Sequence, residues 1–149
     1  MAKTLVGDVE YALEPLTKSL GFLTRVVQVQ INERVRAAGG LHVSPAVFST
    51  LRLIQANPGI RQVHAARILL IQESNMANLV KDLIAQGLIE RREEEGKRIG
   101  LWITDKGEEE VEHGNQSDEL DRSYANALSD KEYQRLLQLL DRAYRAALA

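Results

Sequence analysis

The stretch that decides the fold is residues 71–104, IQESNMANLVKDLIAQGLIERREEEGKRIGLWIT. Apolar residues recur in its first half at helical spacing, which predicts a helix over residues 73–86 that ends at Gly87. The face expected inside carries Met76, Leu79, Val80 and Leu83, and the face expected outside carries Ser74, Asn75, Asn78 and Lys81. Residues 88–92 and 99–104 are typical of two strands. The stretch therefore predicts a helix followed by a small β-hairpin.

Two further short helices are predicted just before this stretch. Ser44 and Pro45 provide an N-cap hydroxyl and a proline at the first helical position, so a helix begins there. Residues 57–59, Asn-Pro-Gly, end it. Residues 60–70 predict the second helix, and a tight turn over residues 69–72 leads into the quoted stretch. Three short helices followed by a hairpin are typical of a winged helix-turn-helix.

Longer helices are predicted on both sides of this module. Residues 5–14 have helical spacing, and from Leu16 apolar residues repeat for about six turns up to a glycine stop at residues 37–40. Thr104 and Asp105 cap a helix that is expected to run toward Leu128, and residues 129–132, SDKE, form a capping box for the last helix. The apolar faces of these helices are too large for so small a module, so a second copy of the chain is the simplest partner.

Composition bounds the possible functions. The chain of 149 residues fits one domain, and it has no cysteine, which excludes disulfides and thiolate chemistry. No apolar run approaches the roughly 20 residues that span a bilayer, and acids interrupt the N-terminal segment too early for a signal peptide. We expect a cytoplasmic protein without a membrane partner.

Charge is distributed in blocks. The net charge is −2, but residues 108–121 hold seven acids and no Lys or Arg, which leaves 19 basic and 14 acidic residues elsewhere. Such a distribution permits a basic face on an acidic protein. A charge run is also the ordinary composition of a solvated helix face, so the pattern by itself establishes no partner.

The order of these segments resembles the MarR-type transcriptional regulators. The resemblance covers roughly residues 15–149, and it depends on GLIERR (87–92), on the T-x-K-G sequence at residues 104–107 and on LSDKEYQRLLQLL (128–140). It implies a mainly α fold with a small β-wing, in which a winged helix-turn-helix over about residues 44–104 stands on a helical dimerisation base. The base would comprise about residues 5–38 and 105–149 of a single domain spanning residues 1–149. The resemblance further implies a homodimer that binds DNA, represses transcription and releases DNA when a small molecule binds.

Under this resemblance the outer face of the helix over residues 73–86 would read DNA. Asn pairs bidentately with adenine, Ser bonds donors or acceptors, and Lys takes guanine or phosphate. The N-terminus of the preceding helix, at Arg61 and Gln62, would lie against the DNA backbone. The complete set of expected DNA-binding residues is Arg61, Gln62, Ser74, Asn75, Asn78, Lys81, Arg91, Lys97 and Arg98. A polar helix face that simply meets water remains the plain alternative for the helix taken alone.

The wing departs from the family pattern. The family has an Asp-x-Arg sequence whose arginine enters the minor groove, and here Glu95 and Lys97 take those places in a loop about two residues shorter. The acids at residues 93–95 would repel phosphates if they faced DNA. We expect them to pair partly with Arg91, Arg92 and Arg98, which leaves Lys97 to reach the minor groove. Lys inserts less favourably than Arg because its ammonium is more strongly hydrated.

The helix-turn-helix departs from the pattern at two positions. Leu70 stands where the family has a glycine in a left-handed conformation, and Gln72-Glu73 replaces an Asp-Pro type of cap. Each change weakens the local geometry by about 1 kcal/mol.

An effector pocket between the dimerisation helices and the DNA-binding lobe is also implied by the resemblance. The candidate lining residues are Tyr11, Phe22, Arg25, His42, Phe48 and Trp102. Arg25 and His42 are the expected polar anchors, and a guanidinium with aromatic walls suits an aromatic carboxylate. For each of these residues a core or surface role is the competing interpretation.

Other function classes find less support. His113 and Glu109 share a helical face in the acidic block, but two ligands make a poor metal site, so we expect neither a metal nor a cofactor. No paired carboxylates, activated nucleophile or glycine-rich phosphate loop indicates an enzyme. The alternative to a DNA-binding regulator is a protein-interaction module of the same fold, which the glutamates of the wing favour.

Overall fold

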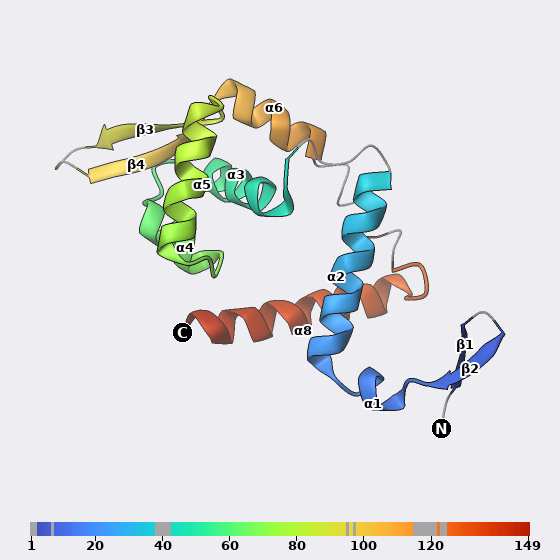
Figure 1. The fold of residues 1–149 in the computed structure, drawn as a ribbon. Helices are drawn as coiled ribbons and strands as arrows, with labels where there is room; N and C mark the ends of the chain where they lie inside the picture. The colour runs from blue at the N-terminus through green and yellow to red at the C-terminus, as the bar shows by residue number, and fades with distance from the viewer. Residues whose placement is uncertain are drawn as a thin grey trace. The chain divides into compact units, whose positions relative to one another are not determined.

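The computed structural model describes residues 3–6, 8–37, 43–94, 96, 98–114, 122 and 125–149. They belong to two compact units, residues 1–40 and residues 41–149. Figure 1 labels their helices and strands.

The first unit begins with an antiparallel hairpin instead of the helix predicted over residues 5–14. Strand β1 (Lys3–Val6) pairs with β2 (Val9–Ala12), with Val6 opposite Val9 and Lys3 opposite Ala12. The helix prediction is wrong here because the apolar spacing of this segment also fits a strand. Thr4, Val6 and Val9 are β-branched, which favours strands over helices.

The long helix predicted from Leu16 is interrupted near its start. A single turn, α1 (Glu14–Thr17), has Pro15 in its first turn as expected, and α2 (Leu20–Ala37) follows after a break. The hydroxyl of Ser19 accepts a hydrogen bond from the Phe22 amide at 3.3 Å, so Ser19 starts a new helix. The predicted end of the helix at residues 37–40 agrees with the observed end of α2.

The second unit contains the predicted winged helix-turn-helix. Its elements are α3 (Pro45–Ala56), α4 (Gln62–Ile68), α5 (Glu73–Ala85), β3 (Ile89–Glu94) and β4 (Arg98–Ile103), followed by α6 (Asp105–Gly114) and α8 (Asp130–Leu148). The Ser44 hydroxyl caps α3 by accepting from the Val47 amide. β3 and β4 pair antiparallel, and Ile60 bridges to Leu101 on the other edge of β4. The predicted fold class, mainly α with a small β-wing, is confirmed.

The core lies between the three short helices, the hairpin and α6. Its fully buried side chains include Leu51, Ile54, Met76, Val80, Leu83, Ile89 and Leu101. Two glycines of α6 permit its close approach to this core. A Cβ on Gly107 would lie 2.2 Å from the Leu88 carbonyl oxygen, and a Cβ on Gly114 would lie 2.1 Å from the Phe48 ring.

The structure describes the first part of the helix that was predicted to run from residue 105 toward Leu128. α6 ends at Gly114, and residues 125–127 form a turn. The intervening residues 115–121, 123 and 124 lie outside the described residues. The predicted capping box of the last helix is confirmed, because the Ser129 hydroxyl accepts from the Glu132 amide and the Glu132 carboxylate accepts from the Ser129 amide at 2.8 Å.

Candidate nucleic-acid interface

Helix α5 separates its polar and apolar side chains onto two faces. Met76, Val80 and Leu83 are fully buried in the core. The residues predicted to read DNA, Ser74, Asn75, Asn78 and Lys81, are all exposed. Because the exposed residues are three or four positions apart, they form one stripe along the helix. The buried side chains therefore hold α5 in place while this stripe presents donors, acceptors and one cation to the surroundings.

The C-terminal end of α5 is closed by a Schellman motif. Gly87 adopts a left-handed conformation with φ of +72°. Its amide donates to the Ile84 carbonyl at 2.9 Å, and the Leu88 amide donates to the Leu83 carbonyl at 2.9 Å. Glycine adopts this conformation without a Cβ penalty. The chain therefore leaves α5 in a defined direction, toward β3.

The T-x-K-G sequence after the wing secures this same helix end. The Thr104 hydroxyl donates to the Gly87 carbonyl at 2.6 Å, and Lys106 Nζ donates to the Gln86 carbonyl at 2.8 Å. A lysine at the C-terminus of a helix also interacts favourably with the helix dipole. The sequence marked this motif as part of the resemblance, and the structure shows its role, which is to connect the end of α5 to the start of α6.

The turn before α5 has the same geometry without a glycine. Leu70 has φ of +52°, the left-handed conformation for which the family has a glycine at this position. Its side chain is 62% exposed. Its amide donates to the Arg67 carbonyl at 3.3 Å, and the Ile71 amide donates to the Ala66 carbonyl at 2.9 Å. The Schellman motif is therefore complete, although a leucine in this region of backbone space is strained.

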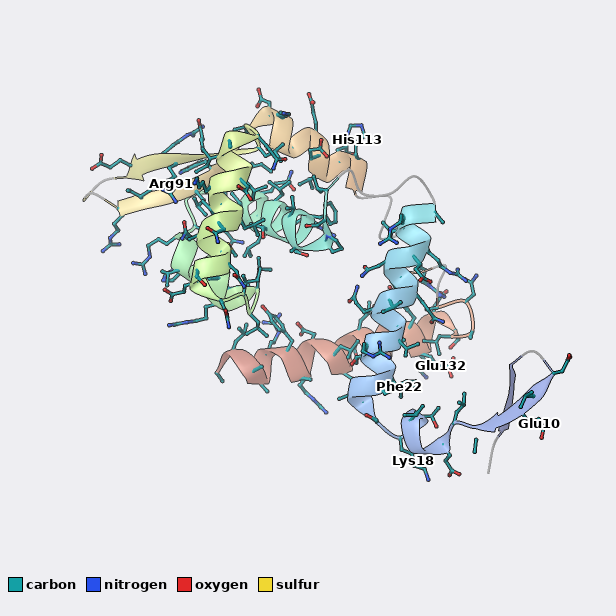
Figure 2. The ribbon with its side chains drawn as sticks, in the orientation of Figure 1. Glu10, Lys18, Phe22, Arg91, His113 and Glu132 are labelled. Atoms are coloured by element: carbon teal, nitrogen blue, oxygen red, sulfur yellow. The ribbon has the colours of Figure 1, made fainter. Side chains whose placement is uncertain are left out.

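The start of α4 contacts the wing. Arg91 lies on β3 and is labelled in Figure 2. Its Nη2 atom donates to the Gln62 Oε1 atom at 3.0 Å. Arg61, at the N-cap, has no capping side-chain bond, and its guanidinium lies against the ring of His64. Arg61, Gln62 and Arg91 are thus gathered at one end of α4. His64, which also lies on this helix, is exposed beside them.

The wing is short and carries its charges on two faces. Its last strand pair is Glu94 opposite Arg98, and Gly96 turns the chain with φ of +87°. Arg92 stacks on the Trp102 ring, with its guanidinium carbon 4.8 Å from the ring centroid, and it pairs with Glu90. Arg92 is therefore engaged on the outer face of the wing, and its acidic partner is Glu90. Lys97, predicted to reach the minor groove, lies outside the described residues.

The predicted effector residues are distributed over both units. Phe22 and Arg25 lie on α2 in the first unit. In the second unit, Phe48 is buried in the core against Gly114, whereas Trp102 alternates with the buried Leu101 and faces the other side of β4. His42 and the side chain of Tyr11 lie outside the described residues.

No metal-binding group is formed within the part of the chain that the structure describes, since no three His, Asp or Glu side chains gather there. His113 Nδ1 lies 2.7 Å from the Glu109 carbonyl oxygen, so the ring contacts the backbone of the residue with which it shares a helical face. Among the described helices, none combines the length and apolar character that crossing a bilayer requires.

A helix with a buried apolar face and an exposed polar stripe, preceded by a tight turn and followed by a β-ribbon, defines the chain as a winged helix-turn-helix protein. Residues 42–99 match the model of the MarR family. This match agrees with the family that the resemblance in the sequence predicted. Among curated proteins, no significant match was found.

Solved structures of regulators share the fold over most of the chain. CouR, a transcriptional repressor bound to a 23-mer DNA duplex, is 25% identical, with a TM-score of 0.78 over 91% of this chain and 99% of that chain. CouR bound to p-coumaroyl-CoA has a TM-score of 0.74. PcaV from Streptomyces coelicolor, in complex with its natural ligand, is 21% identical, with a TM-score of 0.76 over 89% of this chain and 96% of that chain. Apo MarR from E. coli is 20% identical, with a TM-score of 0.67 over 84% and 96% of the two chains.

Proposed function

We propose that this chain is a dimeric, sequence-specific DNA-binding repressor that a small-molecule effector releases from its operator. The observation that carries the proposal is the stripe on α5, where Asn75 and Asn78 are exposed while Met76 and Val80 anchor the opposite face. Such a helix fits the major groove of B-DNA, where amide side chains distinguish adenine from the other bases. The 25% identity to CouR, whose structure contains a DNA duplex, supports the same function.

Two sets of residues would divide the work of binding. Ser74, Asn75 and Asn78 would contact base edges, because they occupy the first turns of α5. Arg61, Lys81, Arg91 and Arg98 would contact phosphates and fix the register on the duplex, a contribution that carries no sequence information by itself. Lys97 would reach toward the minor groove. The match of residues 42–99 to the MarR family model supports a regulator in preference to an enzyme.

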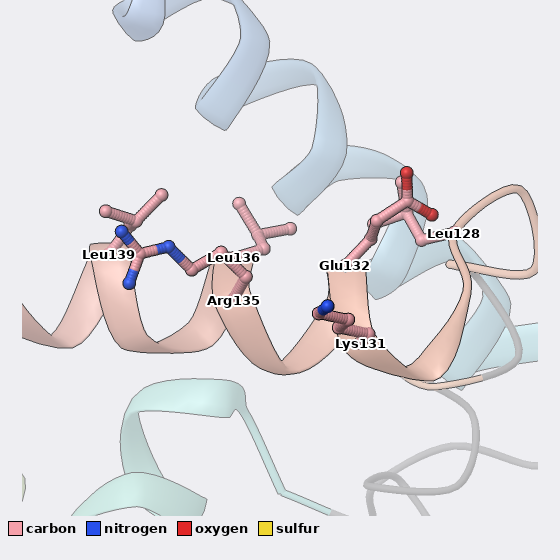
Figure 3. Close-up of a pocket in the computed structure, with 6 residues that line it drawn as sticks. All are labelled: Leu128, Lys131, Glu132, Arg135, Leu136 and Leu139. Atoms are coloured by element: carbon pink, nitrogen blue, oxygen red, sulfur yellow. The ribbon is translucent and has the colours of Figure 1, made fainter.

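A homodimer would follow from the apolar face of the last helix. Leu136, Leu137, Leu139 and Leu140 are each between 40% and 43% exposed on α8. An open groove on this helix is lined by Leu128, Lys131, Glu132, Arg135, Leu136 and Leu139 (Figure 3). An apolar surface of this kind is rarely left in water. An isologous contact between two copies would cover it and would set two α5 helices about 34 Å apart, one turn of duplex.

Release by an effector needs two states of the dimer that DNA and ligand prefer differently. The complexes of CouR with p-coumaroyl-CoA and of PcaV with its natural ligand support a ligand-responsive regulator. For this chain we propose an aromatic carboxylate, with Arg25 and His42 as its polar anchors and with aromatic walls supplied from Tyr11, Phe22, Phe48 or Trp102.

Binding of duplexes from the region upstream of the gene tests the proposal. Fluorescence anisotropy at increasing salt should show one pseudo-palindromic site whose affinity falls steeply, since counterions return to the phosphates when the protein leaves. Sedimentation should show a dimer at the same concentrations. Absence of binding at low salt, where electrostatic attraction is strongest, would overturn the proposal.

A protein-interaction module is the second candidate, and the acidic wing favours it. Glu90, Glu93 and Glu94 follow the core-proximal part of β3, and Arg92 is engaged by Trp102 and Glu90. Replacing Glu93, Glu94 and Glu95 together by lysine separates the two candidates. Duplex affinity rises if the wing lies along DNA, whereas a partner that recognises the acids is lost.

A further inference from the structure

The turn between α4 and α5 leaves one backbone acceptor for another part of the chain to satisfy. At the end of α4 the Leu69 amide donates to the Ala65 carbonyl, the Ile71 amide to Ala66 and the Leu70 amide to Arg67. The carbonyl of Ile68 comes next. Among the backbone hydrogen bonds of the described residues, none reaches its oxygen. The last carbonyl of a helix that lacks a backbone donor must find a side chain or water.

A side chain from the far end of the sequence provides this donor. The Tyr144 hydroxyl, on α8, donates to the Ile68 carbonyl oxygen at 2.6 Å, a bond between residues 76 positions apart. This distance is that of a well-formed O–H···O hydrogen bond. The bond therefore joins the C-terminal helix to the carbonyl two residues before Leu70, the strained position of the turn.

We infer that Tyr144 is a positioning residue for α5, in that its hydroxyl completes the helix-turn-helix turn and ties α8 to it. The inference rests on the proposed function, because the consequence of positioning α5 is DNA binding. This role requires no contact between Tyr144 and a base. Tyr144 acts through the backbone of Ile68, and the polar stripe of α5 begins only six residues further along the chain, at Ser74.

The leucine at residue 70 makes such a tie useful. At the other end of α5 the equivalent position is Gly87, which accepts a left-handed backbone without strain. At the turn a leucine holds φ of +52°, so the motif on this side depends more on its hydrogen bonds. Any change that moves α8 also moves the Tyr144 hydroxyl. The turn before α5, which is the more strained of the two turns that flank this helix, then loses a hydrogen-bond donor. Tyr144 thereby couples a movement of α8 to the position of α5.

The hydroxyl should matter for the position of the turn more than for global stability. Tyr144 is 36% exposed, so after its removal water can replace the donor at Ile68. Tyr144→Phe should consequently shift the melting temperature by no more than about 2 °C. A loss of DNA affinity without a comparable loss of stability would distinguish positioning from a plain folding defect.

The test compares Tyr144→Phe with Tyr133→Phe in the full-length protein. Both variants remove one hydroxyl from α8, and Tyr133 retains its ring beneath the Arg122 guanidinium in the control. The first measurement is amide hydrogen exchange at Leu70 and Ile71, which needs no DNA. We expect exchange to be about five-fold faster in Tyr144→Phe and unchanged in Tyr133→Phe. Unchanged exchange in Tyr144→Phe would overturn the inference.

The second measurement is the affinity for operator duplex at fixed salt. We expect Tyr144→Phe to bind about five-fold more weakly, with Tyr133→Phe equal to wild type. If Tyr144→Phe exchanges faster but binds duplex as tightly as wild type, the hydrogen bond from Tyr144 to Ile68 secures the turn without positioning α5. That result would overturn the inference. If the wild-type protein binds no duplex, the proposed function fails, and the exchange measurement still decides whether Tyr144 secures the turn.

A double variant provides a stricter control. Leu70→Gly relaxes the left-handed position, so the turn should need the tyrosine less. In the Leu70→Gly background, Tyr144→Phe should accelerate exchange at Ile71 by less than half of its effect in wild type, because the two changes act on one motif. Fully additive effects would show that the hydroxyl and the turn are independent.

Discussion

Arg91 and Gln62 form a hydrogen bond of 3.0 Å that joins strand β3 of the wing to the first turn of α4. One of the five N–H donors of Arg91 is used in this bond, and the residue is otherwise exposed. The guanidinium is therefore held at the start of α4, and its other N–H groups can donate to a ligand. This arrangement suits a phosphate contact, because an arginine that is already ordered loses less entropy when it binds.

Replacing Arg91 by alanine should weaken duplex binding uniformly across sequences and reduce the slope of log affinity against log salt by about 1, as expected for the loss of one phosphate contact. The matched control is Arg92→Ala on the same strand. Arg92 stacks on Trp102 and pairs with Glu90, so its removal should leave the salt slope unchanged. Anisotropy titrations at several salt concentrations provide both slopes. Equal slopes in wild type and Arg91→Ala would exclude a phosphate contact.

Leu70→Gly should stabilise the protein by about 1 kcal/mol, since relief of the left-handed strain exceeds the added entropy of the unfolded chain. Leu70 is exposed, so little buried area is lost. Leu70→Ala removes the same side chain but keeps the Cβ, and it should therefore give no such gain. Urea unfolding of the three proteins measures the differences. A Leu70→Gly variant no more stable than Leu70→Ala would mean that the turn is unstrained.

The winged helix-turn-helix could be predicted from the sequence because its boundaries are marked by local chemistry. Ser44 caps α3 through its own side chain, Gly87 takes a positive φ at the end of α5, and Ser129 with Glu132 closes the start of α8. Each signal acts within four residues. The exposed stripe of α5 likewise follows from helical spacing and from the buried side chains on the opposite face.

The parts that sequence reasoning missed depend on contacts between distant residues or on ambiguous spacing. The apolar pattern of residues 5–14 fits a strand as well as a helix, and pairing of β1 with β2 decides between them. The bonds from Tyr144 to Ile68 and from Lys106 to Gln86 end on backbone carbonyls. Because every residue has a backbone carbonyl, such an acceptor leaves no mark in the sequence.

Gly107→Ala should destabilise the protein by about 2–3 kcal/mol, because the added methyl group would lie 2.2 Å from the Leu88 carbonyl oxygen, a backbone atom with little freedom to move. Gly21 on α2 provides the control, since the nearest atom to its added Cβ among the described residues, outside its own helix backbone and chain neighbours, is the Ser19 hydroxyl oxygen at 4.0 Å. Gly21→Ala should be neutral or stabilising by about 0.5–1 kcal/mol. Thermal unfolding followed by circular dichroism measures both. A tolerated alanine at residue 107 would show that α6 and the end of α5 can separate.

The capping box should make the last helix sensitive to acid. Hydrogen bonds from the Ser129 side chain and backbone lower the pKa of Glu132 below its ordinary value of 4.5. A lowered pKa means that the ionised carboxylate favours the folded helix, so its contribution is complete above pH 4.5 and is lost as the pH falls through the lowered pKa. The melting temperatures of wild type and Glu132→Gln should therefore converge as the solution is acidified. A constant difference across this range would show that the charge of Glu132 contributes nothing.

Asn75→Ala and Asn78→Ala should each cost about 1–3 kcal/mol of binding to the operator and should relax the preference at one base pair, because an amide that pairs bidentately with adenine is replaced by a methyl group. Both side chains are exposed, so neither change should lower the melting temperature. Lys81→Ala is the matched control on the same stripe. Loss of a phosphate contact at Lys81 should weaken all sequences equally and reduce the salt slope, without a change in preference. Selection of bound duplexes from a randomised library shows the preference of each variant. If Asn75→Ala and Asn78→Ala select the same sequences as wild type, the bases are read by other residues, and α5 serves only to place the protein on the backbone.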